Sequence, residues 1–191
     1  KHSIKENMKI ISQAQLENFK NFIETHKAFV ICGHKEPDGD CIASSLGIAK
    51  ILDFYKKPYQ ILNAGPFKRT ETKVFENKFK TQFVRQTNNL EDTGLIIVDC
   101  SETFRLGDME SQLANLDSFI IDHHKTANVS EEKSILDSSA PAAACLVQLL
   151  YEALVGKLDK ETAEILFFGL ATDTGYFKFL DNNSPDIFIL A

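Results

Sequence analysis

Residues 28–40 read AFVICGHKEPDGD, and this stretch decides the fold of the chain. Ala28 to Cys32 is an unbroken apolar run, which is typical of a strand covered on both faces. From Asp38 onward the apolar residues recur at helical spacing, which predicts a helix over residues 38–54. A buried strand followed by a short polar loop and a helix is the first unit of an α/β sheet.

Apolar spacing along the rest of the chain continues this alternation of strands and helices. The sequence therefore predicts an α/β fold with a mostly parallel sheet of about five strands and helices on both faces. Asp159 is the expected N-cap of the predicted helix that ends at residue 171. We expect helices over residues 10–26, 68–80, 142–154 and 159–171, and further strands over residues 59–62, 82–85, 95–98 and 118–121.

The composition is that of an ordinary globular domain: 191 residues, 43% hydrophobic and 25% charged. A net charge of −6 argues against a protein that binds long nucleic acids, because such proteins usually carry a basic face. The longest apolar stretch, residues 165–171, is too short to cross a bilayer, so we expect no membrane association. The four cysteines form no CxxC pair, which is typical of reduced thiols in a cytoplasmic protein.

Acidic and imidazole side chains follow three of the predicted strands and one predicted helix. Because the carboxyl ends of parallel strands meet at one edge of a sheet, we expect these side chains to lie together. Burying them side by side is costly unless a cation holds them, so the sequence predicts a metal site. The residues are His34, Asp38 and Asp40 after the first strand, Asp99 and Asp122-His123-His124 at the ends of two others, and Asp173 after the last helix.

Residue spacing indicates how two divalent ions about 3.5–4 Å apart could share these ligands. Taken singly, Asp38 or Asp40 would be a helix N-cap and Asp173 a turn residue. The metal interpretation is favoured because all of these alternatives would have to hold at once. We expect His34 and Asp38 on one ion, Asp40, His123 and Asp173 on the other, and Asp99 as the bridge.

Four ordered motifs make the chain similar to a known family. The motifs are Gly33-His34 with Pro37-Asp38-Gly39-Asp40, then Val98-Asp99, then Asp122-His123-His124, then Thr172-Asp173-Thr174-Gly175. In this order they are highly specific, and the chain resembles the DHH phosphoesterase superfamily over residues 28–190. It looks most like the branch of oligoribonucleases, phosphoadenosine-phosphate phosphatases and cyclic-dinucleotide phosphodiesterases, which Arg105-Leu106-Gly107 also fits.

The resemblance implies two manganese ions, or magnesium or another divalent cation in their place. His124 would face the scissile phosphate, as a catalytic and substrate-binding residue. Asp122 would orient a histidine by accepting an imidazole N–H, and Arg105 would hold substrate or order its loop. The implied ligands are His34, Asp38 and Asp99 for one ion, and Asp40, Asp99, His123 and Asp173 for the other.

An enzyme with this resemblance would be a two-manganese phosphoesterase in which a hydroxide between the ions attacks phosphorus in line. The expected substrates are small nucleotides: very short RNA, 3′-phosphoadenosine 5′-phosphate, cyclic di-AMP or its linear dinucleotide product. A family II inorganic pyrophosphatase is the nearest alternative, although that family tends to have threonine where this chain has Gly39. A RecJ-type DNA exonuclease fits the acidic balance less well, and a non-catalytic metal- or nucleotide-binding module would be expected to lack ligands.

Two features depart from the expected branch. Its members usually carry a Ser-Ser-Thr run where this chain has Ala140-Pro141-Ala142-Ala143-Ala144, so the substrate preference is open. The glycine-rich, histidine-containing substrate domain of the family has no counterpart here. We expect an amphipathic helix within residues 1–27, a catalytic domain over residues 28–182, and in residues 183–191 the start of a linker helix toward a further domain. A homodimer is left open.

Overall fold

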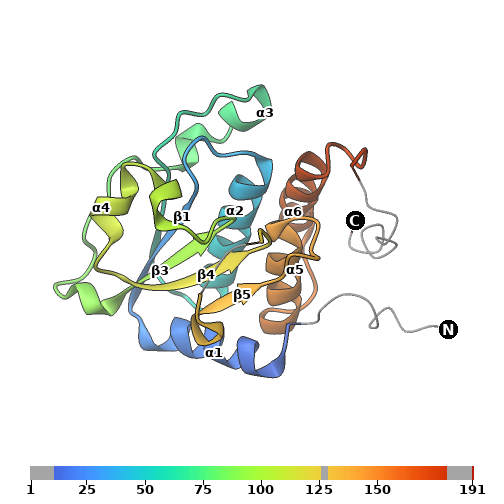
Figure 1. The fold of residues 1–191 in the computed structure, drawn as a ribbon. Coiled ribbons are helices and arrows are strands. Elements are labelled where there is room, and N and C mark those ends of the chain that lie inside the picture. The colour runs from blue at the N-terminus through green and yellow to red at the C-terminus, as the bar shows by residue number, and fades with distance from the viewer. Residues whose placement is uncertain (1–10, 126–128, 180–190) are drawn as a thin grey trace.

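The computed structural model describes residues 11–125, 129–179 and 191. Within these residues a five-stranded sheet forms the centre of the molecule (Figure 1). Every neighbouring pair of strands is parallel, which confirms the predicted sheet type. The strands are β1 (Ala28–Gly33), β2 (Tyr59–Leu62), β3 (Thr93–Val98), β4 (Asp117–Asp122) and β5 (Ser134–Leu136).

Most of the expected helices form, and N-cap side chains cap the first turns of three of them. Ser12 and Gln15 make a reciprocal capping box on the first helix, and Asp38 and Asp159 accept backbone N–H groups at the start of two others. The helices are α1 (Gln13–Thr25), α2 (Gly39–Phe54), α3 (Thr70–Lys73), α4 (Met109–Leu113), α5 (Ala143–Leu154) and α6 (Lys160–Asp173). Short 3₁₀ turns are η1 (Glu76–Lys78), η2 (Leu90–Asp92), η3 (Thr103–Leu106) and η4 (Glu131–Lys133).

The strand order is β2-β1-β3-β4-β5, so the chain leaves β1 toward one edge and then continues on its other side. This reversal makes the crevice beyond the carboxyl ends of β1 and β3 a topological switch point, where open α/β sheets bind ligands. The register matches Gly33 with Val98 and Val98 with Ile121. The residues that follow these strands therefore emerge beside one another.

Helices cover both faces of the sheet, as predicted, but unequally. Alternate strand residues such as Phe29, Ile31 and Phe119 face α1, α2, α5 and α6 in the larger core. Their neighbours Val30 and Ile97 face a smaller core closed by η3 and α4. Figure 1 shows α5 and α6 on one side of the sheet and α4 on the other.

The strand predicted over residues 82–85 does not form. The backbone N–H of Phe83 donates to the side-chain oxygen of Gln112 at 3.0 Å, and the N–H of Val84 donates to Gln60 at 3.1 Å. Side-chain amides thus satisfy this backbone in place of a strand partner. The fifth strand is β5 instead, whose three residues are too few for a periodic signal.

Two other differences concern short helices. The helix predicted over residues 68–80 is broken into α3 and η1, which together bury only Thr72 and so lack the packing that sustains a longer helix. The five-residue α4 was not predicted. The linker helix expected in residues 183–191 lies almost wholly outside the described residues. Among the described residues, no helix combines the length and apolar character needed to cross a membrane.

Candidate metal centre and active site

The ends of β1 and β3 bring a first group of acidic and imidazole side chains together. Because Gly33 pairs with Val98, His34 and Asp99 follow as neighbours. The Nε2 atom of His34 lies 3.2 Å from Oδ2 of Asp99 and 3.7 Å from Oδ1 of Asp38. Asp38 is fixed as the N-cap of α2, where its Oδ1 accepts a backbone N–H of the first turn at 3.0 Å.

A second group lies on the other side of Asp99. The Nε2 atom of His123 lies 3.4 Å from Oδ1 of Asp99, 3.6 Å from Oδ2 of Asp173 and 3.7 Å from Oδ2 of Asp40. Asp99 therefore turns one oxygen toward His34 and the other toward His123. The structure brings together the side chains that were expected to converge, in the two groups that were expected to bind one ion each.

The two histidines that are candidate metal ligands are held in the same tautomer. Nδ1 of His34 lies 2.8 Å from the carbonyl oxygen of Lys35, and Nδ1 of His123 lies 3.2 Å from that of Ala140. A carbonyl oxygen only accepts hydrogen bonds, so each Nδ1 carries the proton. A neutral ring then presents the lone pair of Nε2 to carboxylates, which is repulsive unless a proton or a cation lies between them.

Two polar atoms at the centre of the site are buried without a hydrogen bond to any described residue. They are Oδ1 of Asp99 and Nε2 of His123. A buried polar atom without a partner is costly and rare in native proteins. Carboxylate oxygen and imidazole nitrogen are both suitable ligands for manganese or a similar divalent cation, so the donor set fits such an ion.

Asp40 accepts hydrogen bonds from the N-terminus of α5, a contact that the sequence analysis did not predict. The buried carboxylate accepts the backbone N–H groups of Ala143 at 2.6 Å and Ala144 at 2.8 Å, and the hydroxyl of Ser44 at 3.3 Å. The partial positive charge of a helix N-terminus favours such an anion. The segment that lacks the usual hydroxyls therefore supports Asp40, and through the Ala140 carbonyl also His123, with its backbone.

Asp99 adopts an unusual backbone conformation. Its φ of 58° lies in the left-handed region, which costs a residue with a side chain free energy relative to glycine. Its N–H continues the sheet by donating to the carbonyl of Ile121 at 2.9 Å. Strain of this kind persists only where the surrounding structure holds it, and it is concentrated at functional sites.

Asp122 holds His124 from beneath. Its Oδ1 accepts the backbone N–H groups of His123 at 2.8 Å and His124 at 3.1 Å, and Nδ1 of His124 lies 2.7 Å from the same oxygen. Asp122 is fully buried, whereas the His124 side chain is 40% exposed. The carboxylate thus fixes the orientation of a ring that reaches the surface.

Negative charge dominates the electrostatics of the site. Burial opposes charge on His34, but hydrogen bonds to Asp38 and Asp99 and the charge of Asp99 raise its pKa to about 10. Burial likewise opposes charge on His123, yet Asp99 and Asp40 raise its pKa to about 9. Burial, and then the charge of Asp99, raise the pKa of Asp40 well above its usual range. All three pKa shifts favour added positive charge in the site, either as a proton or as a bound cation.

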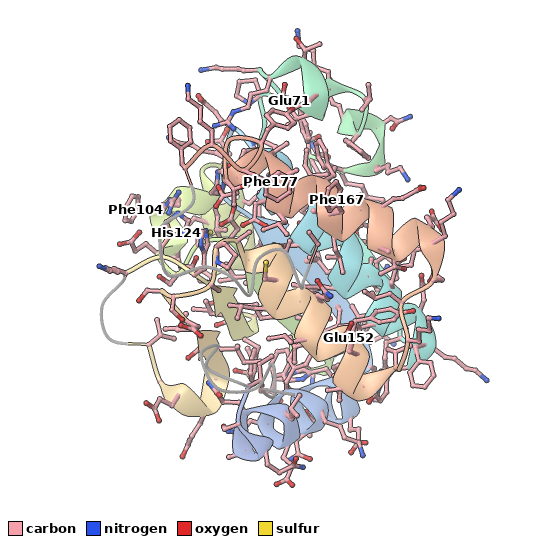
Figure 2. The ribbon with its side chains drawn as sticks, turned by 90° about the vertical axis from the view of Figure 1, so that its right-hand side faces the viewer. Glu71, Phe104, His124, Glu152, Phe167 and Phe177 are labelled. Carbon is pink, nitrogen blue, oxygen red and sulfur yellow. The ribbon has the colours of Figure 1, made fainter. Side chains whose placement is uncertain are left out.

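The site is open on one side. Asp40 and Asp99 form its floor, whereas the side chains of Asp173 and His124 are 27% and 40% exposed. The structure places Arg105 on η3, the turn that follows Asp99, where it is half-buried. Figure 2 looks onto the side of the molecule that carries His124.

A comparison with known protein families identifies the family to which this chain belongs. The family described as "DHH family, N-terminal domain" matches residues 28–170, a span that includes His34, Asp99 and His124. The chain belongs to the DHH family.

Curated relatives of this DHH chain include an oligoribonuclease and several pyrophosphatases. It is 29% identical over 164 residues to the bifunctional oligoribonuclease and PAP phosphatase NrnA of Thermus thermophilus, covering 84% of the chain and 47% of that protein. It is 27% identical over 150 residues to a manganese-dependent inorganic pyrophosphatase of Methanothrix thermoacetophila, covering 78% of the chain and 48% of that protein. The DHH chain thus spans about half the length of these relatives.

Solved structures support the fold of the DHH chain. An exopolyphosphatase-related protein of Bacteroides fragilis matches with a TM-score of 0.80 and 24% identity, covering 96% of this chain and 56% of that one. A putative family II inorganic pyrophosphatase of Methanococcus jannaschii matches with a TM-score of 0.54 and 23% identity, covering 85% and 55%. At these identities the matches show a shared fold.

Proposed function

We propose that this chain carries the catalytic centre of a metal-dependent phosphoesterase that hydrolyses small nucleotides. The observation that supports this most directly is the place of Asp99 between the two groups of candidate ligands, with a buried oxygen that has no hydrogen bond to a described residue. The proposed substrates are very short RNA, a linear dinucleotide, cyclic di-AMP and 3′-phosphoadenosine 5′-phosphate. The proposed cofactor is a pair of manganese ions.

The two ligand groups have distinct tasks in this proposal. His34 and Asp38 hold one cation and Asp40, His123 and Asp173 the other, while Asp99 contributes an oxygen to each. When bound, two such cations make water a better nucleophile and neutralise charge on phosphoryl oxygens. The buried floor of the site keeps its carboxylates rigid, so their oxygens need little rearrangement as the reaction proceeds.

His124 is the proposed contact to the substrate. Asp122 accepts the Nδ1–H of the ring, so the opposite edge of the imidazole is directed away from the buried carboxylate. When Nε2 is protonated as well, that edge can donate a hydrogen bond to a phosphoryl oxygen or a proton to the leaving oxygen. Its 40% exposure allows this contact without movement of the sheet.

Inorganic pyrophosphate is the second candidate substrate. Relatives with that activity in their names are 25–27% identical to this chain, close to the 29% of the nuclease relative. Gly39 counts against this candidate, because pyrophosphatases of this type tend to have threonine at that position.

The test is a turnover assay with manganese on diadenylate, cyclic di-AMP, 3′-phosphoadenosine 5′-phosphate and pyrophosphate. We expect at least one nucleotide to be hydrolysed with a higher kcat/KM than pyrophosphate, and hydrolysis to stop when the cation is chelated. The variant Asp99→Asn should be inactive on every substrate. A higher kcat/KM for pyrophosphate than for every nucleotide would favour pyrophosphate hydrolysis as the function. Binding of cations and nucleotides without turnover would indicate a binding module.

A further inference from the structure

The turn η3 forms part of the wall beside the metal centre. It begins four residues after Asp99, and its Arg105 carbonyl oxygen accepts the backbone N–H of Lys35, the residue after His34, at 2.7 Å. At the end of the turn, a methyl group added to Gly107 would lie 3.2 Å from the side chain of Lys35. The turn is therefore packed against the loop that follows β1.

Phe104 projects from this turn, and the turn itself is firmly anchored. The side chain of Phe104 is 66% exposed, whereas Leu106 is 1% exposed and lies in the smaller core. The hydroxyl of Thr103 donates to Glu110 of α4 at 2.7 Å. Figure 2 shows Phe104 and His124 on the same side of the molecule.

Exposure of one aromatic ring says little by itself, because scattered apolar side chains are normal on protein surfaces. Phe54 is 55% exposed at the far end of α2 and needs no functional explanation. Phe104 differs because a turn with three separate anchors presents it on the side of the molecule that carries the candidate catalytic residue His124. A ring held in this way loses little conformational freedom when a flat ligand packs against it.

Positive charge accompanies the ring at this rim. Arg105 is its neighbour in sequence, and the guanidinium of Arg69 is among the groups that lower the pKa of Asp38, so it also lies near the site. A nucleotide presents a flat aromatic base and a phosphate a short distance apart. An aromatic face with cations beside it matches that pair of features, and pyrophosphate offers only the second of them.

We propose that Phe104 is a substrate-binding residue that stacks on a nucleobase while the adjacent phosphate occupies the metal centre. This inference rests on the proposed function and sharpens it: Phe104 makes the site select nucleotides over inorganic phosphoanhydrides. Stacking is tolerant of base identity because every base has an aromatic face, so selection is for a base and not for a particular sequence.

The test compares wild type, Phe104→Ala and Phe104→Tyr on three substrates with manganese: 5′-phosphorylated diadenylate, an abasic analogue of the same dinucleotide, and pyrophosphate. Phe54→Ala is the matched control, since it removes an equally exposed ring about 20 Å along α2 from the ligands at the start of that helix. A second arm measures binding of a non-hydrolysable, phosphonate-linked dinucleotide that contains 2-aminopurine, whose fluorescence is quenched by stacking.

We expect Phe104→Ala to raise KM for diadenylate about 5- to 150-fold with little change in kcat, and to leave the other two substrates unaffected. Phe104→Tyr and Phe54→Ala should resemble wild type, and quenching of 2-aminopurine should be lost only in Phe104→Ala. An unchanged KM for diadenylate, or an equal rise for the abasic analogue, would overturn the inference and leave nucleotide hydrolysis intact. If wild type hydrolyses none of the substrates, the proposed function fails, and the fluorescence arm still decides whether Phe104 stacks on a base.

Discussion

Asp99 combines several properties that are unfavourable singly. It is 2% exposed, its backbone is left-handed, and one of its carboxylate oxygens makes no hydrogen bond to a described residue. Such a residue destabilises the folded state unless another interaction compensates for its free-energy cost. In the proposed function, a cation on each side of the carboxylate would provide that compensation, and Asp99 lies between two histidines as this requires.

The bridging position of Asp99 leads to a prediction about metal stoichiometry. We expect wild type to bind two manganese ions per chain, His34→Ala to retain one, and Asp99→Asn to lose affinity at both positions. The affinity for manganese should fall more than about 10–100-fold, which is the usual effect of removing a residue that hydrogen-bonds to a metal ligand. Isothermal titration calorimetry and metal analysis after gel filtration measure it, with the surface variant Asp92→Asn as control. Two ions retained in Asp99→Asn would contradict the bridge.

A second prediction at this scale concerns Asp122, which orients His124 and is not among the proposed ligands. Asp122→Asn keeps the shape of the side chain but removes the negative charge that the imidazole N–H faces. We expect kcat to fall about 10–100-fold while manganese content and thermal stability change little. Unchanged kcat, or loss of bound metal, would show that Asp122 has a different role.

At the scale of elements, α2 and α6 approach so closely that only glycine fits between them. A methyl group added to Gly39 would lie 2.1 Å from Oγ1 and 2.8 Å from Cβ of Thr172. The two residues are neighbours of Asp40 and Asp173, which both lie near His123. Helix packing and the spacing of the candidate ligands are thus coupled at this contact.

We therefore expect Gly39→Ala to push the two helices apart. The free energy of unfolding should fall by about 1–3 kcal/mol, as overpacking usually costs, and manganese affinity should fall with it. Chemical denaturation and calorimetry measure the two effects. Thr172→Ala added to Gly39→Ala removes part of the clash and should restore part of both losses. A Gly39→Ala protein as stable as wild type would show that the helices can move without penalty.

At the scale of the whole molecule, the metal centre joins parts of the chain that are far apart in sequence. Ligands from the ends of three strands and two helices meet there, so a bound cation links them in the folded state alone. Cation binding should therefore stabilise the whole fold and not one loop.

Each manganese ion bound at 100 times its dissociation constant should add about 2.7 kcal/mol and raise Tm by about 5–11 °C. Differential scanning calorimetry checks this, and a chelator should reverse it. Asp99→Asn should show little of the increase, while Asp92→Asn should show all of it. An equal increase in Asp99→Asn would place the stabilising ion elsewhere.

The core gives a prediction about pH. All four cysteines lie in the described part of the chain, buried and without disulfides, and burial raises the pKa of Cys32 to about 12. Burial also raises the pKa of Cys145 above its usual range. The folded state then keeps protons that an unfolded thiol, with a pKa of about 8.5, releases.

Because the folded state binds more protons above pH 8.5, stability should fall as pH rises from about 9 to 11. Each buried thiol should contribute up to about 1.4 kcal/mol per pH unit in that range. Urea unfolding at several pH values measures the slope, and Cys32→Ala with Cys145→Ala should reduce it. A slope unchanged by these two substitutions would assign it to other groups.

Much of the fold and of the candidate site was predictable because its signals are local. The apolar run from Ala28 to Cys32 and the helical spacing after Asp38 lie within single elements, where periodicity reports burial directly. Segments that bury little gave wrong predictions, as with residues 82–85. There the outcome depended on side-chain amides of Gln60 and Gln112, which come from distant parts of the chain.

The sequence by itself determined which residues belong to the candidate site, because carboxylates and imidazoles at the ends of apolar segments are recognisable from their type and position. Only the tertiary structure decided the strand order that puts β1 beside β3, the left-handed turn at Asp99, and the N–H groups of Ala143 and Ala144 that hold Asp40. The physical reason is that strand pairing and backbone hydrogen bonds use groups that every residue has. Their partners are therefore fixed by packing of the whole chain and leave no mark in the local sequence.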